Sequence, residues 1–347
     1  MRIGVIGASG YAGLELLRLL AGRSGDEVVL ITSRQEAGQK LTELFPALAG
    51  LANYDQLRFV EPAALAGQAD VFLLAAQHGA AMVLVPELLA AGAKVVDLSA
   101  DFRLRSPEEF ALWYGLPHAA PELLAQAVYG LPELYAEKIK KAALTANPGC
   151  YPTSVILALA PVLKARLLDP SQVPVADAKS GVTGAGRGAV LSNAFCEVQD
   201  NFKSYKTVGH RHTPEMLQEL STLWGQQVKL AFTPHLLPIN RGILATVYVK
   251  LAPPPSLEAL RGLFLDFYRE ARFVRVRPLG QSPETADVRG TNFCDLALFH
   301  DRASGLFKIV SVIDNLCRGA AGQAVANLNL MTGRPEEHGL LLPAVRP

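Results

Sequence analysis

The stretch Gly7-Ala8-Ser9-Gly10-Tyr11-Ala12-Gly13 gives the clearest indication of how this chain folds. It lies between an apolar run at residues 2–6, which we predict as a strand, and a predicted helix over residues 11–21. Glycines at such a turn let the backbone bend tightly and approach a pyrophosphate, whose charge then lies at the helix N-terminus. The triplet alone is weak support, but its place after the first strand of an alternating pattern indicates a dinucleotide site.

That alternation continues through the first 150 residues. Further strands are predicted over residues 28–32, 57–60, 71–75, 94–98 and 142–146, and a second clear helix over residues 79–91. Continuously apolar strands are typical of a sheet covered by helices on both faces. The pattern therefore predicts an α/β fold with a Rossmann-type doubly wound parallel sheet.

The pattern changes from about residue 152. A helix over residues 153–168 is followed by β-runs at 173–178, 228–233, 243–251, 293–300 and 306–313, with another helix over 257–271. Residues 301–305 resemble a hairpin turn. We predict one domain over 1–150 and a second, α+β domain over 151–316 with a mostly antiparallel sheet, which also mediates oligomerisation. A C-terminal helix over 317–333 is predicted to pack back on the first domain.

Bulk composition excludes several classes of protein. A chain of 347 residues, 50% hydrophobic and 19% charged, suits two ordinary globular domains. Lys and Arg number 33 against 32 for Asp and Glu, so we expect no nucleic-acid partner. Glycines interrupt the apolar N-terminal run, and no apolar stretch reaches about 18 residues, so neither a secretory signal nor a membrane partner is expected.

The end of the second predicted strand indicates which dinucleotide is bound. NAD-binding proteins usually carry an Asp or Glu about 20 residues after the glycine loop. Here the strand ends in Thr32-Ser33-Arg34 with no acid at its tip, and a hydroxyl beside a guanidinium suits a 2′-phosphate. NADP is therefore favoured, although Arg34 can also be a solvated loop cation. The residues expected at the dinucleotide in this domain are Gly7, Ser9, Gly10, Tyr11, Ala12, Gly13, Ser33 and Arg34.

A candidate nucleophile lies in Asn147-Pro148-Gly149-Cys150-Tyr151-Pro152-Thr153, where the first domain joins the second. Pro152 suits the first turn of the following helix, which places Cys150 just ahead of the helix N-terminus. The helix dipole and exposed N–H groups there stabilise a thiolate, lower its pKa and can hold an oxyanion. Cysteine is more often a small buried hydrophobic residue, and we expect that role for the other three: Cys196, Cys294 and Cys317. No CxxC pair is present, which favours a reducing, cytoplasmic environment.

Candidate acid/base groups occur in Gly209-His210-Arg211-His212-Thr213-Pro214-Glu215. Thr213 is a plausible N-cap and Pro214 a plausible first helical residue. The positive end of that helix should depress the pKa values of both histidines, so that one is neutral at pH 7 and acts as a base or acid. Alternatively, both merely cap the helix or bind solvent. His210 and His212 also have the spacing of a metal pair, but no third ligand is nearby, so no metal is expected.

Three further sites carry groups suited to anions or to nicotinamide. Arg103 follows the fifth predicted strand and can hold a phosphate, or can pair with Asp97 or Asp101 instead. The glycine-rich loop at residues 180–187 would let a nicotinamide ring or substrate approach the backbone closely. Asn315, after the last strand, can supply an amide for the nicotinamide carboxamide.

These motifs follow one another along nearly the whole chain, as GASGYAG, TSR, DLSADFR, NPGCYPT, KSGVTGAGR, GHRHTPE and DNLCRGAAGQA. The ordered series resembles the N-acetyl-γ-glutamyl-phosphate reductases of arginine biosynthesis, relatives of aspartate-semialdehyde dehydrogenase. The resemblance implies NADPH-dependent reduction of N-acetyl-L-glutamyl 5-phosphate to N-acetyl-L-glutamate 5-semialdehyde plus phosphate. It also implies a cytoplasmic oxidoreductase that forms a homodimer or homotetramer.

The resemblance further assigns roles to residues. Cys150 would attack the acyl phosphate and form a thioester, which hydride from NADPH reduces. The acid/base would be His210, with His212 as second choice. The substrate would lie near Arg103, Ser180 and Glu215, and the nicotinamide near Gly181, Gly184 and Asn315.

Two rival functions stay open. A related enzyme of lysine biosynthesis reduces an aminoadipyl phosphate held on an acidic carrier protein, but Pro148, Tyr151 and Pro152 follow the arginine-pathway form. Compared with aspartate-semialdehyde dehydrogenases, this chain has Ser180 where a glutamine is expected and Arg241 where a late histidine is expected. Both differences disfavour aspartyl phosphate as substrate. A non-catalytic NADP-sensing protein would keep the glycine loop and lose the nucleophile, which is present here. The acyl chain length, the oligomer size and the choice between the histidines are not decided by the sequence.

Overall fold

The computed structural model describes residues 1–346, which divide into two compact units. The first unit contains Met1–Pro148 and Ala320–Leu341, and the second contains Gly149–Gly319 with residues 342–346. Cys150, which we placed at the end of the first domain, thus lies at the start of the second unit.

The first unit is built on a seven-stranded sheet with the order β3-β2-β1-β4-β5-β7-β6. All of its strand pairs are parallel. The strands are β1 (Arg2–Ile6), β2 (Glu27–Thr32), β3 (Phe59–Val60), β4 (Val71–Leu74), β5 (Lys94–Asp97), β6 (Val128–Tyr129) and β7 (Leu144–Ala146). This order is that of doubly wound dinucleotide-binding folds, and it confirms the predicted α/β class. Only β6 was missed, because two residues are too few to show a pattern.

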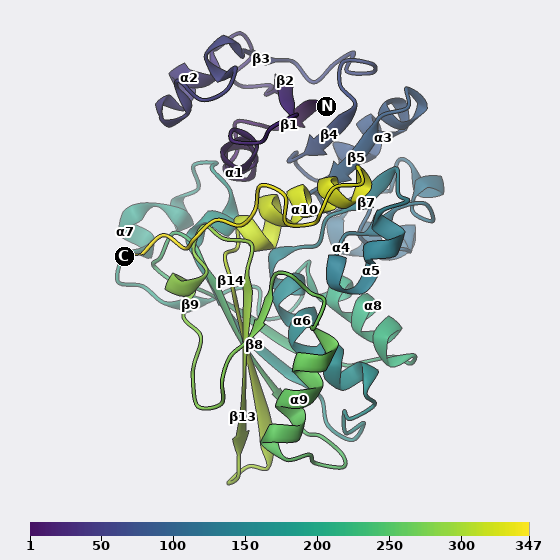
Figure 1. Ribbon diagram of the computed structural model, residues 1–347, viewed down its shortest axis with the longest axis vertical. Coiled ribbons are helices and arrows are strands. Elements are labelled where there is room, and N and C mark those ends of the chain that lie inside the picture. The colour runs from purple at the N-terminus through teal and green to yellow at the C-terminus, as the bar shows by residue number, and fades with distance from the viewer. Residues whose placement is uncertain (347) are drawn as a thin grey trace. The chain divides into compact units, whose positions relative to one another are not determined.

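Helices connect these strands, and one of them comes from the far end of the chain. They are α1 (Tyr11–Leu20), α2 (Leu41–Leu44), α3 (Ala81–Ala90), α4 (Pro107–Tyr114), α5 (Pro132–Ile139) and α10 (Gly322–Met331). Helix α10, yellow in Figure 1, packs against α1, α5 and β5. Helix α10 therefore belongs to the first unit.

The second unit contains a mixed seven-stranded sheet with the order β12-β13-β14-β11-β8-β10-β9. The strands are β8 (Val175–Ser180), β9 (Lys203–Ser204), β10 (Ala231–Leu236), β11 (Ile243–Val249), β12 (Val274–Val276), β13 (Cys294–Asp301) and β14 (Leu306–Ile313). Two pairs, β8 with β10 and β12 with β13, are parallel, and the other pairs are antiparallel. The predicted hairpin joins β13 to β14, with Asp301 opposite Leu306.

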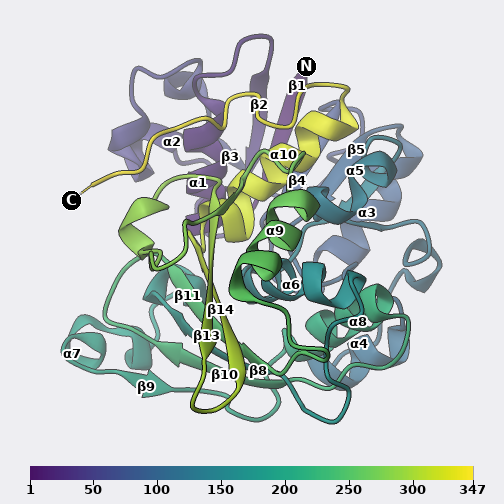
Figure 2. The same cartoon turned by 60° about the horizontal axis from the view of Figure 1, so that its bottom comes forward.

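Helix α6 (Cys150–Lys164) forms the centre of this unit. Every residue from 151 to 163 is buried, as expected for a helix that is apolar on all sides. It packs on β11 and β14 and against α8 (Thr213–Trp224) and α9 (Leu257–Phe267), and Figure 2 shows α6 and α9 beside the sheet. The short helix α7 (Phe195–Val198) lies away from it, next to β9.

Helix α3 begins two residues later than predicted, and the starts of two helices that carry site residues were also wrong. Helix α6 begins at Cys150 rather than residue 153, because the first N–H groups of a helix need no intrahelical partner and Pro152 is tolerated in that turn. Helix α8 begins at Thr213, so His212 is its N-cap and Thr213, not Pro214, is the first helical residue. A π-helical turn over Cys317–Ala321 precedes α10 and was not predicted.

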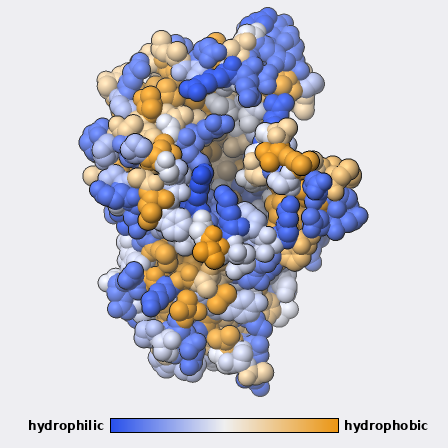
Figure 3. Space-filling model, turned by 180° about the vertical axis from the view of Figure 1, so that it is seen from behind, coloured by the Kyte–Doolittle hydropathy of each residue, from blue (hydrophilic) through white to orange (hydrophobic). Residues whose placement is uncertain are grey.

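The surface carries both hydrophobic and hydrophilic side chains. On the face shown in Figure 3, hydrophobic side chains lie in small groups between hydrophilic ones. No helix among residues 1–346 is both long enough and apolar enough to cross a bilayer.

Candidate active site

Each of the three glycines in the first loop is required for a different structural reason. Gly7 has a φ of 76°, and a Cβ there would lie 2.5 Å from the carbonyl oxygen of Ala75. A Cβ on Gly13 would lie 2.5 Å from Cα of Ala8, so α1 can approach the loop only because Gly13 has no side chain. Gly10, the N-cap of α1, has open space beside it, with its nearest contact 3.6 Å away. A tight turn, close helix packing and an open backbone at the helix N-terminus together make an anion-binding loop.

The other predicted dinucleotide residues surround this loop. Tyr11 and Ala12 open α1 directly after the N-cap. The Ser9 hydroxyl donates to the Ser33 hydroxyl at 2.9 Å, which ties the loop to the end of β2. Ser33 is buried and Arg34 is exposed. Arg34 directly follows the serine that is tied to the loop, so its exposed guanidinium is available to an anion bound there.

Cys150 is the first residue of α6 and is half-buried. Gly149 is its N-cap, and no acidic residue occurs in the first turn. The N–H of Gly149 donates to Oε1 of Glu215 at 2.7 Å, and Glu215 is 1% exposed. The carboxylate at the start of α8 thus holds the turn that carries the cysteine. Its predicted contact with substrate stays a prediction.

His210 lies inside an aromatic cage. Its ring centroid is 5.6 Å from that of Tyr151, 5.7 Å from Tyr205, 5.4 Å from Phe232 and 5.0 Å from His212. Burial, together with the positive charges of nearby Lys206 and Arg211, lowers the pKa of His210 to about 4. The imidazole is therefore neutral at pH 7.

The tautomer of His210 follows from one hydrogen bond. The backbone N–H of His212 donates to Nδ1 of His210 at 3.1 Å. A nitrogen that accepts carries no proton, so the neutral ring has its proton on Nε2. His210 can thus donate from Nε2, whereas His212 caps α8 through its backbone.

Two tyrosines beside the cage, Tyr151 and Tyr205, were not predicted as site residues. The Tyr205 hydroxyl donates to the Tyr151 hydroxyl at 3.1 Å, which donates in turn to the carbonyl oxygen of His235 at 3.3 Å. Burial raises the pKa of Tyr205 to about 12 and raises that of Tyr151 further, so both are neutral. Tyr151 could have been found as the neighbour of Cys150, but nothing in the sequence around Tyr205 points to a site.

The residues predicted at the nicotinamide come together in the second unit. A Cβ on Gly184 would lie 3.6 Å from Oγ of Ser180 and 3.8 Å from Nδ2 of Asn315. Asn315 accepts from the N–H of Gly242 at 2.8 Å and donates to Oγ1 of Thr183 at 3.0 Å. Its amide has a second N–H that suits a carboxamide oxygen.

Ser180 and Gly181 make close contacts within the protein itself. Ser180 is 3% exposed, and its hydroxyl donates to the carbonyl oxygen of Gly181 at 3.0 Å. A Cβ on Gly181 would lie 2.7 Å from the carbonyl oxygen of Asn240, so this glycine is needed for backbone packing. Roles for either residue toward substrate or cofactor stay predictions.

Arg103 lies in the first unit and is 7% exposed. Its Nε donates to the carbonyl oxygen of Asn147 at 2.8 Å and its Nη2 to that of Leu98 at 2.7 Å. The guanidinium therefore fixes the segment that leads into the cysteine turn. Its neighbour Asp97 is fully buried, and burial followed by the charge of Asp101 raises the pKa of Asp97 to about 7.

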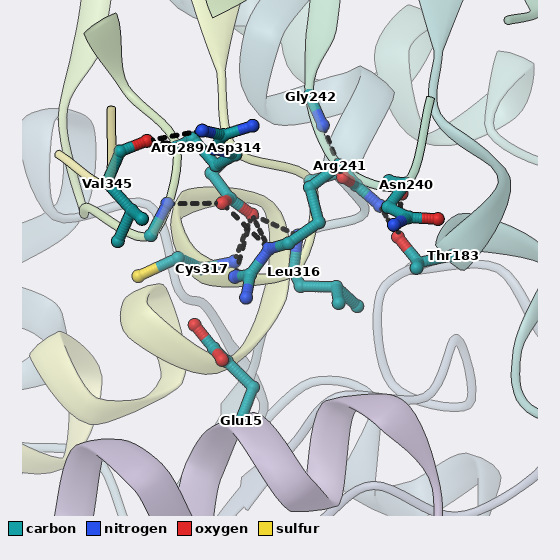
Figure 4. A network of polar contacts seen from close by, with 12 residues as sticks. Glu15, Thr183, Asn240, Arg241, Gly242, Arg289, Asp314, Leu316, Cys317 and Val345 are labelled. Atoms are coloured by element: carbon teal, nitrogen blue, oxygen red, sulfur yellow. Dashed lines mark hydrogen bonds and ion pairs between the residues drawn. The ribbon is translucent and has the colours of Figure 1, made fainter. Parts of the chain in front are cut away.

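A buried ion pair organises the end of β14 (Figure 4). Nε of Arg241 lies 2.9 Å from Oδ2 of Asp314, which is fully buried. Asp314 also accepts from the N–H groups of Gly290 at 2.6 Å, Leu316 at 2.8 Å and Cys317 at 2.9 Å. Asp314 was not among the predicted site residues, although its position before Asn315 was a usable signal.

The other cysteines differ from one another. Cys294 and Cys317 are buried, as predicted, but Cys196 is exposed on α7, so its predicted burial was wrong. Residues 1–346 contain no group of three His, Cys, Asp or Glu side chains arranged to hold a metal ion.

Comparison with known proteins identifies the family. The family model described as "Semialdehyde dehydrogenase, NAD binding domain" matches residues 2–142, and "Semialdehyde dehydrogenase, dimerisation domain" matches residues 150–315. The chain belongs to the semialdehyde dehydrogenase family. It is therefore an oxidoreductase with a nicotinamide-dinucleotide-binding domain, as predicted.

Individual members of the semialdehyde dehydrogenase family are similar over their full length. A protein of Geotalea daltonii named N-acetyl-gamma-glutamyl-phosphate reductase is 52% identical over 341 residues, covering 98% of both chains. A protein of Desulfotalea psychrophila with the same name is 50% identical over 351 residues, covering 100% of both. The aspartate semialdehyde dehydrogenase II of Vibrio cholerae, solved in complex with ASA, has a TM-score of 0.72 at 17% identity and covers 96% of this chain and 98% of its own. At that identity the structural likeness shows the fold alone.

Proposed function

We propose that this chain reduces N-acetyl-L-glutamyl 5-phosphate to N-acetyl-L-glutamate 5-semialdehyde and phosphate with NADPH, in arginine biosynthesis. The observation that carries the proposal is the position of Cys150 at the first residue of a buried helix, in a family of aldehyde-forming enzymes. Full-length relatives at about half identity bear the name of this activity, which supports the choice of substrate.

In this mechanism Cys150 is the nucleophile. Its sulfur attacks the acyl carbon, the bond to the phosphate oxygen breaks, and phosphate leaves, so that a thioester remains on the cysteine. The N-terminal amides of α6 favour the thiolate and can donate to the oxyanion. NADPH, when bound, supplies a hydride to the thioester carbon. The C–S bond of the resulting thiohemiacetal then breaks and releases the aldehyde and the cysteine.

His210 is the proposed acid/base. Its neutral ring presents Nε2–H, which can donate to the substrate oxygen as negative charge develops there. Its tight aromatic surroundings hold the ring in one orientation. Arg103 is proposed to bind the phosphate and Asn315 the nicotinamide. Ser180 and Glu215 are further proposed substrate residues, and His212 is the second choice for the acid/base.

The substrate is tested by the reverse reaction. N-acetylglutamate semialdehyde, NADP and inorganic phosphate should yield NADPH at a rate at least about tenfold above that with aspartate semialdehyde. Cys150→Ala should abolish turnover and still bind NADPH. Faster turnover of aspartate semialdehyde, or of an aminoadipate semialdehyde presented on a carrier protein, would assign the chain to one of the rival substrates. Absence of turnover on any of them, with Cys150 unreactive toward alkylation, would favour the NADP-sensing alternative.

The preference for NADP over NAD is proposed to rest on Arg34, which is exposed beside the glycine loop. Arg34→Asp should weaken NADPH binding at least about tenfold more than NADH binding, because the 2′-phosphate loses a cation and meets a carboxylate. Fluorescence titration of both nucleotides measures this. Arg302→Asp, an equal charge change at another exposed position, is the control. Equal losses for the two nucleotides would remove Arg34 from the cofactor site.

A homodimer or homotetramer in the cytoplasm completes the proposal. The second unit matches a model named for dimerisation, and several large apolar side chains of its residues 190–208 are exposed: Val190, Leu191, Phe195, Phe202 and Val208. Exposed apolar groups of this kind favour contact with a second copy. A reducing compartment suits an enzyme whose nucleophile must stay a thiol. Light scattering coupled to size exclusion gives the oligomer's mass.

A further inference from the structure

The backbone of Gly319 lies directly against Cys150. A Cβ at Gly319 would be 2.6 Å from Cβ of Cys150 and 3.1 Å from its Cα. Gly319 is buried, and its φ is not among the positive values that favour glycine. An alanine could therefore adopt this backbone conformation, and only the space that Cys150 occupies excludes it. Because Cβ of a cysteine cannot move without its backbone, no side-chain rotation relieves the contact.

The position of Gly319 is set by the π-helical turn Cys317–Ala321. Its N–H donates to the carbonyl oxygen of Asp314 at 2.9 Å, a bond that spans five residues and makes the turn wider than an α-helical one. The carboxylate of Asp314 holds the start of the same turn through Cys317 and is itself paired with Arg241 (Figure 4). Arg241, on the segment before β11, thus fixes a turn that touches the nucleophile.

We infer that Gly319 is a positioning residue for Cys150: the π-turn carries its bare backbone against the first residue of α6 and fixes where the sulfur lies. This inference rests on the proposed function only in assigning the chemistry to Cys150. Nucleophilic attack needs the reacting atoms about 3–3.5 Å apart and aligned, and a misplacement of about 1 Å costs roughly a hundredfold in rate. A contact of 2.6 Å leaves no room for even one added methyl group without such a displacement.

The first test is Gly319→Ala. It should lower kcat at least about tenfold, leave the KM for NADP within twofold, and change the rate of Cys150 alkylation by iodoacetamide severalfold. Gly262→Ala on α9 is the matched control, because a Cβ there meets no atom within 4 Å. A Gly319→Ala variant with kcat and alkylation rate within twofold of the unsubstituted protein would overturn the inference.

The second test separates a direct contact from general damage. Cys150→Gly removes the Cβ that the new methyl group would meet, so the loss in Tm caused by Gly319→Ala should be smaller in that background. An equal loss in both backgrounds would show that the two residues are not coupled and would overturn the inference. Neither Tm nor alkylation depends on substrate, so both readouts hold if the proposed reaction proves wrong. If the unsubstituted protein shows no turnover with N-acetylglutamate semialdehyde, that result would contradict the proposed function and leave this inference unaffected.

Discussion

At the scale of single residues, the properties of His210 come from its neighbours rather than from its own position in the chain. Three aromatic rings and His212 surround it, and the nearest charges, Lys206 and Arg211, are positive. Both the lost water and the like charges disfavour the imidazolium form. The sequence predicted a depressed pKa from a helix N-terminus, but the aromatic cage, which could not be read from local spacing, makes the larger contribution through burial.

This environment predicts a pH dependence of stability. The pKa of His210 is about 4 in the folded protein, against an ordinary value of 6.5. Between these values the unfolded chain binds a proton that the folded chain does not, so the free energy of unfolding should fall as the pH is lowered from about 6.5 to about 4. His210→Asn should flatten the dependence of Tm on pH across that window. The control is His300→Asn, which removes an exposed histidine on β13. A slope in His210→Asn equal to that of the unsubstituted protein would contradict the assigned pKa.

Among the secondary-structure elements, β1 and α1 can pack closely only because the loop between them has glycine at the contact points. Gly13→Ala should destabilise the first unit by about 1–3 kcal/mol, because its methyl group would overlap Cα of Ala8. It should also weaken NADPH binding, since the loop has to move. Gly22→Ala, where a Cβ meets nothing within 4 Å, should leave both properties nearly unchanged. Chemical denaturation and nucleotide titration measure the two effects, and equal behaviour of the two variants would refute this account of the loop.

The same scale shows what the sequence could and could not predict. The long parallel strands and α1 were predictable because apolar runs and glycine spacing are local signals. The start of α6 was misplaced because Pro152 is typical of a helix start, whereas it is the third residue of α6 and is tolerated within the first turn. The π-turn Cys317–Ala321 left no local signal, because Asp314, which holds its start, is itself fixed by tertiary contacts with Arg241 and Gly290. For the same reason the contact between Gly319 and Cys150, far apart in sequence, could not be foreseen.

At the scale of the whole molecule, the chain passes between its units at Pro148–Gly149 and again at Gly319–Ala320. Because Gly319 touches Cys150, the first and last turns of the main segment of the second unit are in contact at the nucleophile. The C-terminal segment is then anchored to the first unit by buried charges. Asp26, whose side chain is 1% exposed, pairs with Arg23 at 2.9 Å and with Arg334.

That anchor yields a stability prediction. Burial opposes the ionisation of Asp26, but hydrogen bonds from Arg334 and Arg23 outweigh it and hold the pKa below its ordinary value. The stabilisation is therefore present above about pH 4 and is lost as the pH falls through the folded-state pKa. Asp26→Asn should cost about 3–5 kcal/mol at pH 7, because the buried guanidinium of Arg23 and the partly exposed guanidinium of Arg334 both lose an anionic partner. Asp266→Asn, which breaks an exposed pair with Arg269, is the control and should have almost no effect. Similar losses in both variants would contradict the anchor.

A mass measurement in the absence of phosphate shows whether the reaction passes through an acyl group held on Cys150. The protein is mixed with N-acetylglutamate semialdehyde and NADP in the absence of phosphate, and its intact mass and peptides are determined. We expect about one NADPH to form per active site and an N-acetylglutamyl group to appear on the peptide that contains Cys150. That group should be lost once phosphate is added. Formation of NADPH without any adduct on Cys150, or with the adduct on the exposed Cys196 instead, would contradict a reaction through an acyl group on Cys150.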